Sequence, residues 1–478
     1  MTEPLWTLDA MVAAMQAEIS GAPHAAVTGI SIDSRSLMPG DAYFAIKGDV
    51  HDGHAFVAAA LEKGAALAVV AKDKRADFKP DARLLVVDDV LKALENLGRA
   101  SRARLTGQVI AVTGSVGKTS TKEMLRWVLA AQGETHASIA SFNNHWGVPL
   151  TLARCPASVK YAVFEIGMSA AGEIATLVKM VRPHLAVITT VEPVHLEFFS
   201  GVEAIADAKA EIVLGIEPGG AIVLNRDNPH FARLQKAAKA AGVKRIVSFG
   251  ADPKADARLL DVALHATCSA VHATILKHDV TYKLAVPGRH MAMNSLAVLA
   301  LASLAGCDLA VAALTLSRIA PATGRGDRRE LVVSGGKAAL IDETFNANPA
   351  SMAAALSVLG TSPVDGKGRR IAVLGDMLEL GHDAGELHRG LIRAIDANGV
   401  DLVFCCGPLM RHLWDALSTG KRGGYADDAA GLESQVVAAI RAGDVIMVKG
   451  SKGSRMKPIV TTLEKRFPGD AAFDDATV

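Results

Sequence analysis

The segment that most constrains this chain is a strand, a glycine-rich loop and a helix that follow one another at residues 109–131. Val109–Thr113 is a short apolar run that predicts a buried strand, and Ser120–Ala131 has the apolar spacing of an amphipathic helix. Between them lies the loop Gly114-Ser-Val-Gly-Lys-Thr119. Glycines at such a turn let backbone amides approach an anion at the positive end of the following helix. The segment therefore predicts a phosphate-binding loop.

The side chains of this loop match a nucleoside triphosphate. We expect Lys118 to pair with the β- and γ-phosphates of ATP and the Thr119 hydroxyl to bind magnesium. The full pattern has a glycine at position 112, where this chain has Val112, so the match is the shorter form T-G-x-x-G-K-T. A chance glycine-rich turn is the alternative, which the flanking strand and helix disfavour. The predicted phosphate-binding residues are Thr113, Gly114, Ser115, Val116, Gly117, Lys118 and Thr119.

Short apolar runs alternate with helical patterns over most of the 478 residues. This alternation is typical of doubly wound, parallel α/β sheets. Further strands are predicted at Tyr161–Phe164, Leu185–Thr189, Ala221–Leu224, Arg370–Leu374, Leu402–Cys405 and Val445–Val448. Polar residues break the apolar stretch Met291–Ala320, which therefore predicts two buried helices around Gly306-Cys307-Asp308 and not a membrane span.

Changes along the chain predict three α/β domains. The first hundred residues are rich in turns, such as Asp33-Ser-Arg35 and Asp52-Gly-His54, and indicate a small separate domain at residues 1–103. The polar segment Gly324–Asp327 then divides a central domain, residues 104–326, from a C-terminal domain, residues 327–478. The polar tail Lys465–Val478 is expected to fray.

Charge and cysteine usage exclude several functional classes. The 51 basic and 50 acidic residues give a formal charge of +1, which indicates neither a nucleic-acid surface nor a polybasic membrane patch. The five cysteines form no C-x-x-C pair, so we expect reduced thiols and not a zinc site or a disulfide framework. Met1–Trp6 lacks the pattern of a signal peptide. We therefore expect a cytoplasmic protein with no nucleic-acid partner and no membrane insertion.

Three chemically distinctive residues follow the first strands. Glu165 follows Tyr161–Phe164, His195 follows the next strand, and Lys209 comes after both. Ligands bind at the carboxyl ends of strands in doubly wound sheets, so Glu165 and His195 could converge on the loop. Magnesium prefers oxygen ligands such as Glu165. Taken singly, His195 is better explained as a structural histidine and Lys209 as a solvated helix residue.

Together these motifs resemble the Mur ligase family, the ATP-dependent amide-forming enzymes of peptidoglycan precursor synthesis. The similarity covers nearly the whole chain and includes Asn143–Leu152, Glu165–Ile174, His195–Glu197, Ala208–Glu211, Gly288–Asn294, Asp342–Met352, Leu374–Gly381 and Lys449–Lys452. Two of these stretches, Asn346–Pro349 and Gly375–Gly381, resemble the member that adds D-alanyl-D-alanine. Phe345 and Trp146 depart from that member, which usually has tyrosine and a small or aliphatic residue there. Both are apolar exchanges that we expect to alter packing and not chemistry.

The resemblance implies a UDP-binding first domain, a central ATP-binding P-loop domain and a Rossmann-like C-terminal domain. It implies that Thr119 and Glu165 hold one magnesium ion and that His195 helps to hold a second. Lys209 matches the lysine that family members carboxylate with CO2. The resulting carbamate is an anion, whereas an ammonium group would repel the metal. Forming it requires a neutral amine and hence a lowered pKa.

The resemblance also implies roles for residues outside the loop. Catalytic roles are implied for Lys118, His195, Lys209 and Arg325, and nucleotide contacts for His290, Asn294, Arg325 and Asp342. Substrate contacts are implied for Ser34, Arg35, Asn143, Asn144, Asn346 and Asn348. A solvated linker charge explains Arg325 equally well. Turn chemistry before Pro349 competes for Asn346 and Asn348.

The expected reaction joins D-alanyl-D-alanine to a UDP-N-acetylmuramoyl tripeptide through an acyl phosphate, carried out by a monomer. It would serve cell-wall biogenesis and, through it, cell shape and cell division. The nearest rival is another Mur-type ligase that adds a single amino acid; the first domain argues against a ligase that extends folate. A GTPase would carry Asn-Lys-x-Asp, and Asn225-Arg-Asp-Asn228 fails at its fourth position. A nucleotide-binding scaffold without turnover is the remaining alternative.

Overall fold

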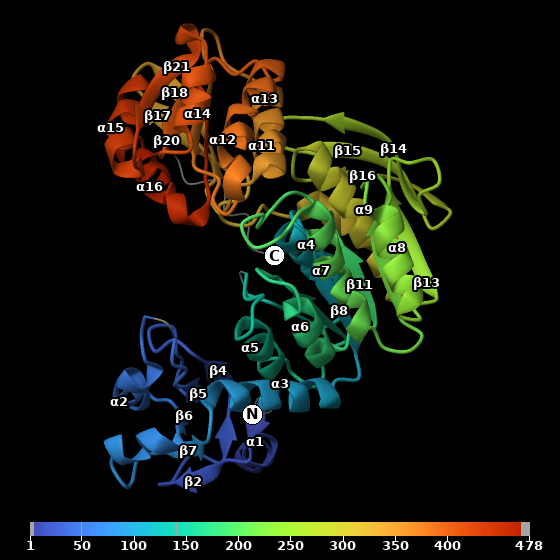
Figure 1. The fold of residues 1–478 in the computed structure, drawn as a ribbon, viewed down its shortest axis with the longest axis vertical. Helices are drawn as coiled ribbons and strands as arrows, with labels where there is room; N and C mark the ends of the chain where they lie inside the picture. The colour runs from blue at the N-terminus through green and yellow to red at the C-terminus, as the bar shows by residue number, and fades with distance from the viewer. Residues whose placement is uncertain (1–3, 49, 140, 470–478) are drawn as a thin grey trace.

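The structure is a computed structural model that describes residues 4–48, 50–139 and 141–469. Three α/β units follow one another along the long axis of the molecule, with the N-terminal unit at one end and the C-terminal unit at the other (Figure 1). Of the tail that we predicted to fray, residues 470–478 lie outside the described residues. Its first residues are ordered, since helix α16 (Lys457–Arg466) continues to Arg466.

The N-terminal unit contains a five-stranded sheet. Its order is β2 (Glu18–Ser20), β7 (Leu84–Val87), β6 (Leu67–Ala71), β5 (Asp41–Phe44) and β4 (Gly29–Ser31). All neighbours are parallel except β2 and β7. The unit also contains the helices α1 (Leu8–Met15) and α2 (Val57–Glu62) and the strand pair of β1 (Trp6–Thr7) with β3 (Ala26–Val27). Helix α3 (Val90–Arg104) leads into the central unit (Figure 1).

The N-terminal and central units share a hydrophobic core. Leu150 and Ala153 of α5 (Gly147–Ala153), which belongs to the central unit, are buried in the core of the N-terminal sheet. Trp6 donates from Nε1 to the Ala153 carbonyl at 2.8 Å, and Arg154 donates to the Ile30 carbonyl at 2.7 Å. Apolar burial and these bonds fix the two units against each other.

The central unit is built on a nine-stranded sheet. Its order is β16 (His278–Leu284), β15 (Ser269–Ile275), β14 (Ala257–Leu264), β13 (Arg245–Gly250), β12 (Ala221–Asn225), β11 (Leu185–Ile188), β8 (Gln108–Thr113), β10 (Tyr161–Glu165) and β9 (Thr135–Ala137). Strands β9 to β14 are parallel, which confirms the predicted parallel α/β sheet. The antiparallel extension β14–β15–β16 was not predicted.

Strand β8 is where the connections change direction. The chain passes from β8 to β9 and β10 on one side and then to β11 and β12 on the other. Such a switch point opens a crevice at the carboxyl ends of the strands, where α/β proteins bind ligands. The predicted phosphate loop follows β8 directly and therefore lies in this crevice.

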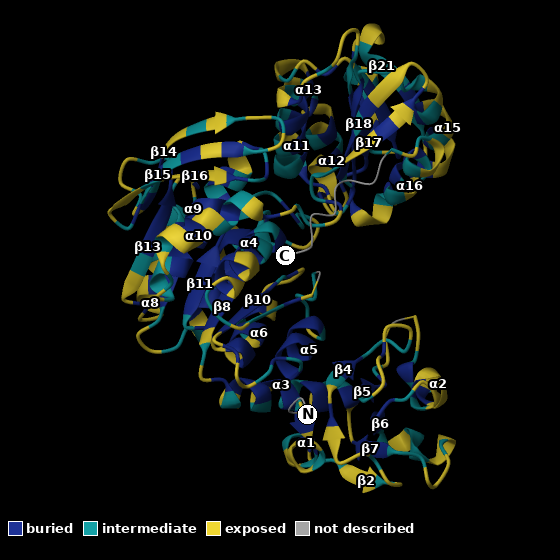
Figure 2. Ribbon diagram, turned by 180° about the vertical axis from the view of Figure 1, so that it is seen from behind, coloured by how far each residue is buried: buried dark blue, intermediate teal, exposed yellow. Residues whose placement is uncertain are grey.

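Helices cover both faces of the central sheet. One face carries α4 (Lys118–Ala130), α9 (Arg289–Leu304) and α10 (Leu309–Thr315), and the other carries α6 (Glu173–Val181), α7 (Val202–Ala210) and α8 (Phe231–Ala240). Strand β8 lies buried between these layers (Figure 2). Helices α9 and α10 confirm the two helices predicted around Gly306-Cys307-Asp308. Val112 is fully buried inside β8, so the loop begins after Thr113.

The C-terminal unit has a six-stranded sheet. Its order is β17 (Asp327–Val333), β18 (Gly336–Glu343), β22 (Val445–Lys449), β19 (Arg370–Gly375), β20 (Leu402–Cys406) and β21 (Arg422–Ala426), and only β17 and β18 pair antiparallel. Its helices are α11 (Pro349–Thr361), α12 (Ala384–Arg389), α13 (Ile392–Ala397), α14 (Arg411–Ala416), α15 (Ala429–Ala439) and α16. The three strands predicted in this part of the chain are present.

Two further predictions concern cysteines and membranes. All five cysteines are free thiols in the structure. Within the described ranges, none of the helices has the length and apolar character needed to cross a lipid bilayer.

Candidate active site

The loop after β8 has the unusual backbone torsions that its two glycines were predicted to allow. Gly114 has a φ of +148° and Gly117 a φ of +83°, a region that side chains disfavour. A Cβ on Gly114 would collide with the Thr189 hydroxyl, and one on Gly117 would lie 2.8 Å from Nδ2 of Asn294. Both positions therefore require glycine for torsion and for space.

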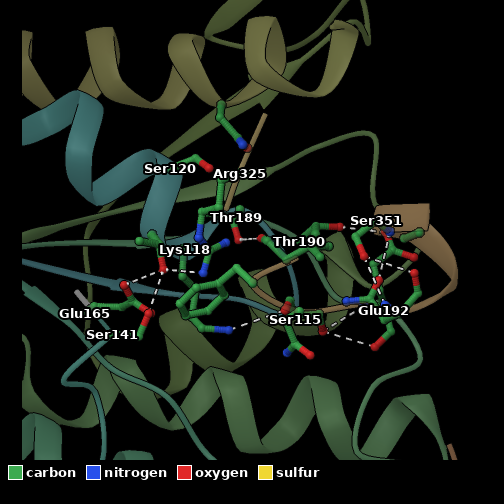
Figure 3. Close-up of a pocket in the computed structure, with 18 of the residues that line it drawn as sticks. Ser115, Lys118, Ser120, Ser141, Glu165, Thr189, Thr190, Glu192, Arg325 and Ser351 are labelled. Atoms are coloured by element: carbon green, nitrogen blue, oxygen red, sulfur yellow. Dashed lines mark hydrogen bonds between the residues drawn. The ribbon is translucent and has the colours of Figure 1, made fainter. Parts of the chain in front are cut away.

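The loop that follows β11 holds the phosphate loop in place. Thr189 donates its hydroxyl to the Val116 carbonyl at 2.5 Å, and the Ser115 amide donates to the Thr190 carbonyl at 2.8 Å. The Ser115 hydroxyl donates to the Glu192 carbonyl at 3.0 Å. Figure 3 shows Thr189, Thr190 and Glu192 beside the phosphate loop. These supports went unpredicted because each bond ends on a backbone carbonyl and joins segments that are distant in the sequence.

Lys118 begins helix α4 and folds back over the loop. Its Nζ donates to the carbonyls of Gly114 at 2.6 Å and Ser115 at 3.3 Å. Burial lowers the pKa of Lys118, and Glu165 opposes that shift. The ammonium group is thus held directly above the turn where phosphates were predicted.

Thr119 and Glu165 converge as the strand-end argument predicted. Glu165 pairs in register with Val112 at the end of the neighbouring parallel strand. The Thr119 hydroxyl donates to Oε2 of Glu165 at 2.9 Å, and Asn143 donates to Oε1 at 2.7 Å. Arg325 donates to the same hydroxyl oxygen of Thr119 at 3.0 Å. This network places a hydroxyl, a carboxylate and a guanidinium at the mouth of the phosphate loop.

The donor set at this point fits a magnesium ion shared with a nucleotide. The described part of the chain contains no group of three or more His, Cys, Asp or Glu side chains that could hold a metal alone. Thr119 and Glu165 offer two oxygen ligands in direct contact. Magnesium commonly uses one or two carboxylates and takes its remaining ligands from phosphates and water. The protein oxygens therefore fit Mg²⁺ bound together with ATP.

Burial, reinforced by the nearby Lys118 ammonium, lowers the pKa of both His195 and Lys209. Burial lowers the pKa of His195; its bond to Glu379 opposes the shift, and Lys118 and Lys209 reinforce it. Lys209, in α7, is only 2% exposed, and burial lowers its pKa well below the usual value, with a further contribution from Lys118. These shifts favour a neutral imidazole and a neutral amine.

A cavity of about 830 Å³ lies between the phosphate loop and the C-terminal unit; Lys118, Glu165 and His195 line it, whereas Lys209 does not. Its lining comes from the phosphate loop, the start of α9, the segment around Arg325 and the start of α11. Cavities of 300–1,000 Å³ are typical of small-molecule sites. The cavity is therefore large enough for a nucleotide and lies at an interface between two units.

Three family models match successive parts of the chain. Residues 26–102 match "Mur ligase family, catalytic domain", residues 112–302 match "Mur ligase middle domain", and residues 327–452 match "Mur ligase, glutamate ligase domain". The UDP-N-acetylmuramoyl-tripeptide--D-alanyl-D-alanine ligase of Bacillus subtilis is 34% identical over 91% of this chain and 93% of its own. That of Escherichia coli is 32% identical over 96% and 98%. The chain belongs to the Mur ligase family.

Solved structures resemble this Mur ligase over nearly its full length. MurF from Acinetobacter baumannii superposes with a TM-score of 0.83 at 29% identity, covering 97% of this chain and 99% of that one. MurF ligase from Thermotoga maritima, solved in complex with ADP, gives a TM-score of 0.75 at 27% identity, covering 92% and 98%. The family and the three-unit architecture implied by the sequence motifs are thus confirmed.

Most of the nucleotide contacts expected for a Mur ligase face the cavity. His290, Asn294 and Arg325 line it, and the Arg325 guanidinium lies 3.9 Å from the centre of the Phe345 ring. That stacking gives the unusual Phe345 a defined partner. Asp342 is not among the lining residues. Its buried carboxylate accepts bonds from Thr344 at 2.6 Å and Lys457 at 2.6 Å, so its contact with ribose stays a prediction.

The predicted substrate residues divide into two groups. Asn143, Asn144, Asn346 and Asn348 line the cavity. Asn348 also caps α11, accepting a bond from the Ser351 amide at 2.9 Å, so the predicted turn chemistry is present. Ser34 and Arg35 lie away from the cavity in the N-terminal unit. Arg35 pairs with Asp33 at 2.7 Å on the surface, and its contact with substrate stays a prediction.

A charged pair that lines the cavity, Lys449 and Glu343, was also missing from the sequence-based site. Lys449, only 2% exposed, donates to Oε2 of Glu343 at 3.3 Å and to the Asn346 carbonyl at 2.9 Å. Burial lowers the pKa of Lys449, and Glu343 opposes the shift. The sequence contained one signal for this residue, since Lys449 directly follows the predicted strand Val445–Val448 and begins the motif Lys449–Lys452. The argument from the carboxyl ends of strands, which identified Glu165, was not applied to Lys449.

Proposed function

We propose that this chain is the ATP-dependent ligase that joins D-alanyl-D-alanine to a UDP-N-acetylmuramoyl tripeptide. The observation that carries the proposal is the contact of Thr119, Glu165 and Arg325 at the mouth of the phosphate loop. It combines metal-binding oxygens with a cation where a phosphoryl group would be transferred. The acceptor is assigned from relatives with that printed name, which match more than nine-tenths of the chain.

The chemistry needs an activated carboxyl group, since a carboxylate does not react with an amine directly. A carboxylate oxygen of the tripeptide attacks the γ-phosphorus of ATP, and the bond to the ADP oxygen breaks. The free amine of D-alanyl-D-alanine then attacks the acyl carbon and loses a proton. The tetrahedral intermediate expels phosphate and leaves an amide.

The protein contributes position and charge to these steps. Lys118 and Arg325 neutralise charge on the transferring phosphoryl oxygens. Bound magnesium supplies further charge neutralisation, and Thr119 and Glu165 would hold one ion while His195 helps to hold a second. His290, Asn294 and Asp342 would contact the adenosine. Closing the cavity excludes water that would hydrolyse the acyl phosphate.

Lys209 would act as a carbamate. Its neutral amine attacks CO2, forms an N–C bond and loses one proton, which gives an anion. The low pKa that burial and Lys118 impose on Lys209 supports this step. Mass spectrometry of Lys209 under bicarbonate and nucleotide tests it. Unmodified lysine under those conditions would contradict the carbamate.

The three units divide the substrates between them. Residues 1–103 would bind UDP through Ser34 and Arg35, residues 104–326 the ATP phosphates, and residues 327–478 the adenosine side and the dipeptide. Asn143, Asn144, Asn346 and Asn348 would contact the substrates where the units meet. We further propose a cytoplasmic monomer that serves peptidoglycan precursor synthesis, and with it cell-wall biogenesis, cell shape and cell division.

Phosphate release tests the proposal. The purified chain is given ATP, Mg²⁺ and UDP-N-acetylmuramoyl tripeptide ending in either meso-diaminopimelate or lysine. D-Alanyl-D-alanine, single amino acids and glutamate are compared as acceptors. Release that depends on the dipeptide supports the assignment. Release that occurs only with a single amino acid would reassign the chain to another Mur-type ligase.

A further inference from the structure

His195 meets a residue of the C-terminal unit across the domain interface. It follows β11, whereas Glu379 follows β19, and the two are 184 positions apart in the sequence. Nδ1 of His195 lies 2.5 Å from Oε2 of Glu379. Next to this pair, the Glu197 amide donates to the Glu379 carbonyl at 3.4 Å. We call residues 195–197 and 379–381 together the docking contact.

Both members of the pair have an unusual backbone conformation. His195 has a φ of +56° and Glu379 a φ of +63°, in the left-handed region that residues with a Cβ avoid. Glycine would relieve this strain at either position. Gly381 also has positive φ, and a Cβ on it would lie 3.4 Å from the Leu196 carbonyl oxygen. Strained residues that keep functional side chains are concentrated at active sites.

The pair leaves one nitrogen of His195 for the cavity. His195 lines the cavity, whereas Glu379 is absent from its lining. A carboxylate is only an acceptor, so Nδ1 must carry the proton of this bond. In a neutral imidazole Nε2 is then unprotonated and offers a lone pair. A lone pair can bind a metal ion, whereas an N–H group cannot.

We propose that Glu379 is a positioning residue that fixes His195 as the Nδ1–H tautomer, with the Nε2 lone pair turned to the cavity. Because Glu379 belongs to the C-terminal unit, His195 is held in this tautomer and orientation only while that unit is docked on the central one. Docking therefore completes the metal-binding side of the cavity. This inference rests on the proposed function, in which His195 helps to hold an ion.

Three variants and one control separate positioning from folding. Glu379→Gly removes the carboxylate and suits the positive φ, so the fold is retained. Glu379→Gln keeps an oxygen acceptor without the charge, and Glu379→Ala removes both. Glu386→Gln is the matched control, since Glu386 lies on α12 in an exposed pair with Arg389 at 3.1 Å.

Nitrogen-15 NMR of labelled histidine reads the tautomer directly and does not depend on turnover. The His195 signal among the 15 histidines is identified by its loss in His195→Gln. At neutral pH we expect the Nδ1–H tautomer in the unaltered protein, in Glu386→Gln and in Glu379→Gln. We expect the Nε2–H form to gain in Glu379→Ala and Glu379→Gly. An unchanged tautomer in Glu379→Gly would overturn the proposal.

Kinetics give the second readout. Loss of a residue that orients a metal-binding histidine typically lowers activity about 10- to 100-fold. We expect this loss in kcat for Glu379→Ala and Glu379→Gly, with partial recovery in Glu379→Gln and full activity in Glu386→Gln. A kcat within twofold of the unaltered protein in Glu379→Gly would refute the role. If the unaltered protein itself shows no dipeptide-dependent phosphate release, the proposed function fails, and the tautomer still tests Glu379.

Discussion

Replacing Arg325 by alanine tests whether the segment between the central and C-terminal units contributes to catalysis. Its guanidinium donates to Thr119 at 3.0 Å and lies 3.9 Å from the Phe345 ring centre. Burial lowers the pKa of Arg325, and Glu165 and Glu343 oppose that shift. The side chain is thus a desolvated cation, held by stacking on Phe345 and bonded to Thr119.

The magnitude follows from these contacts. Removing one preorganised donor to developing charge typically lowers kcat about 10²–10³-fold, which corresponds to about 2.7–4 kcal/mol. The stacking on Phe345 is worth about 2 kcal/mol when desolvated, and it acts in both the ground state and the transition state. The stacking therefore holds the guanidinium in place and contributes little to kcat. We expect kcat of Arg325→Ala to fall about 10²–10³-fold.

Phosphate release at saturating ATP and substrates measures this loss. Arg325→Lys keeps the charge without the planar group, so we expect it to recover only part of the activity. Arg329→Ala is the control, since Arg329 lies nearby in β17 and makes surface pairs with Asp327 and Glu464. A folded Arg325→Ala protein with kcat within threefold of the unaltered one would refute the reasoning.

Three further predictions concern Lys118 and Gly117 in the phosphate loop and His388 in the C-terminal unit. Lys118→Ala removes charge-assisted hydrogen bonds to the phosphates, worth about 1.5–3 kcal/mol each. We therefore expect calorimetry to show an ATP affinity at least tenfold lower. An unchanged affinity would show that Lys118 does not bind the phosphates. Gly117→Ala places a Cβ 2.8 Å from Asn294 Nδ2 at a φ of +83°, so we expect a lower melting temperature and lost nucleotide binding; normal values for both would refute the close approach. Burial lowers the pKa of His388, so the unfolded chain binds its proton first as pH falls below about 6.5. Stability present at neutral pH is then lost on acidification, and Tm should fall less steeply between neutral and acid pH in His388→Gln; equal slopes would contradict this.

Local pattern and one rule of sheet geometry were enough to predict the centre of the site. The apolar run of β8, the two glycines and the following helix are contiguous, so the sequence alone specified the phosphate loop. Glu165 joined it because the ends of neighbouring parallel strands meet at one edge of a sheet. The register of Glu165 opposite Val112 satisfies that rule.

The remaining contacts depend on tertiary packing that no local pattern encodes. Asp342 and Glu343 are adjacent in β18, and adjacent residues of a strand point to opposite faces. Asp342 meets Lys457 of α16 and Glu343 meets Lys449 and the cavity. Choosing between them requires knowing which helix covers each face of the sheet. His195 and Glu379 were separate motifs in the sequence because their contact forms only between two units.

In the proposed mechanism, Lys118 and the buried Lys209 would link metal binding, nucleotide binding and carbamate formation. Burial lowers the pKa of Lys209, and Lys118 lowers it further, because two ammonium groups repel each other in a poorly solvated site. The electrostatic interaction between the two side chains would become attractive if Lys209 were a carbamate, because the negative charge of the carbamate would then face the Lys118 ammonium. Burial and Lys118 together favour the neutral amine that would react with CO2, and the Lys118 ammonium would offset part of the cost of burying the carbamate anion. Under this proposal Lys118 would serve two partners, the phosphates of ATP in the loop and a carbamate at Lys209, and the second role would require no additional residue.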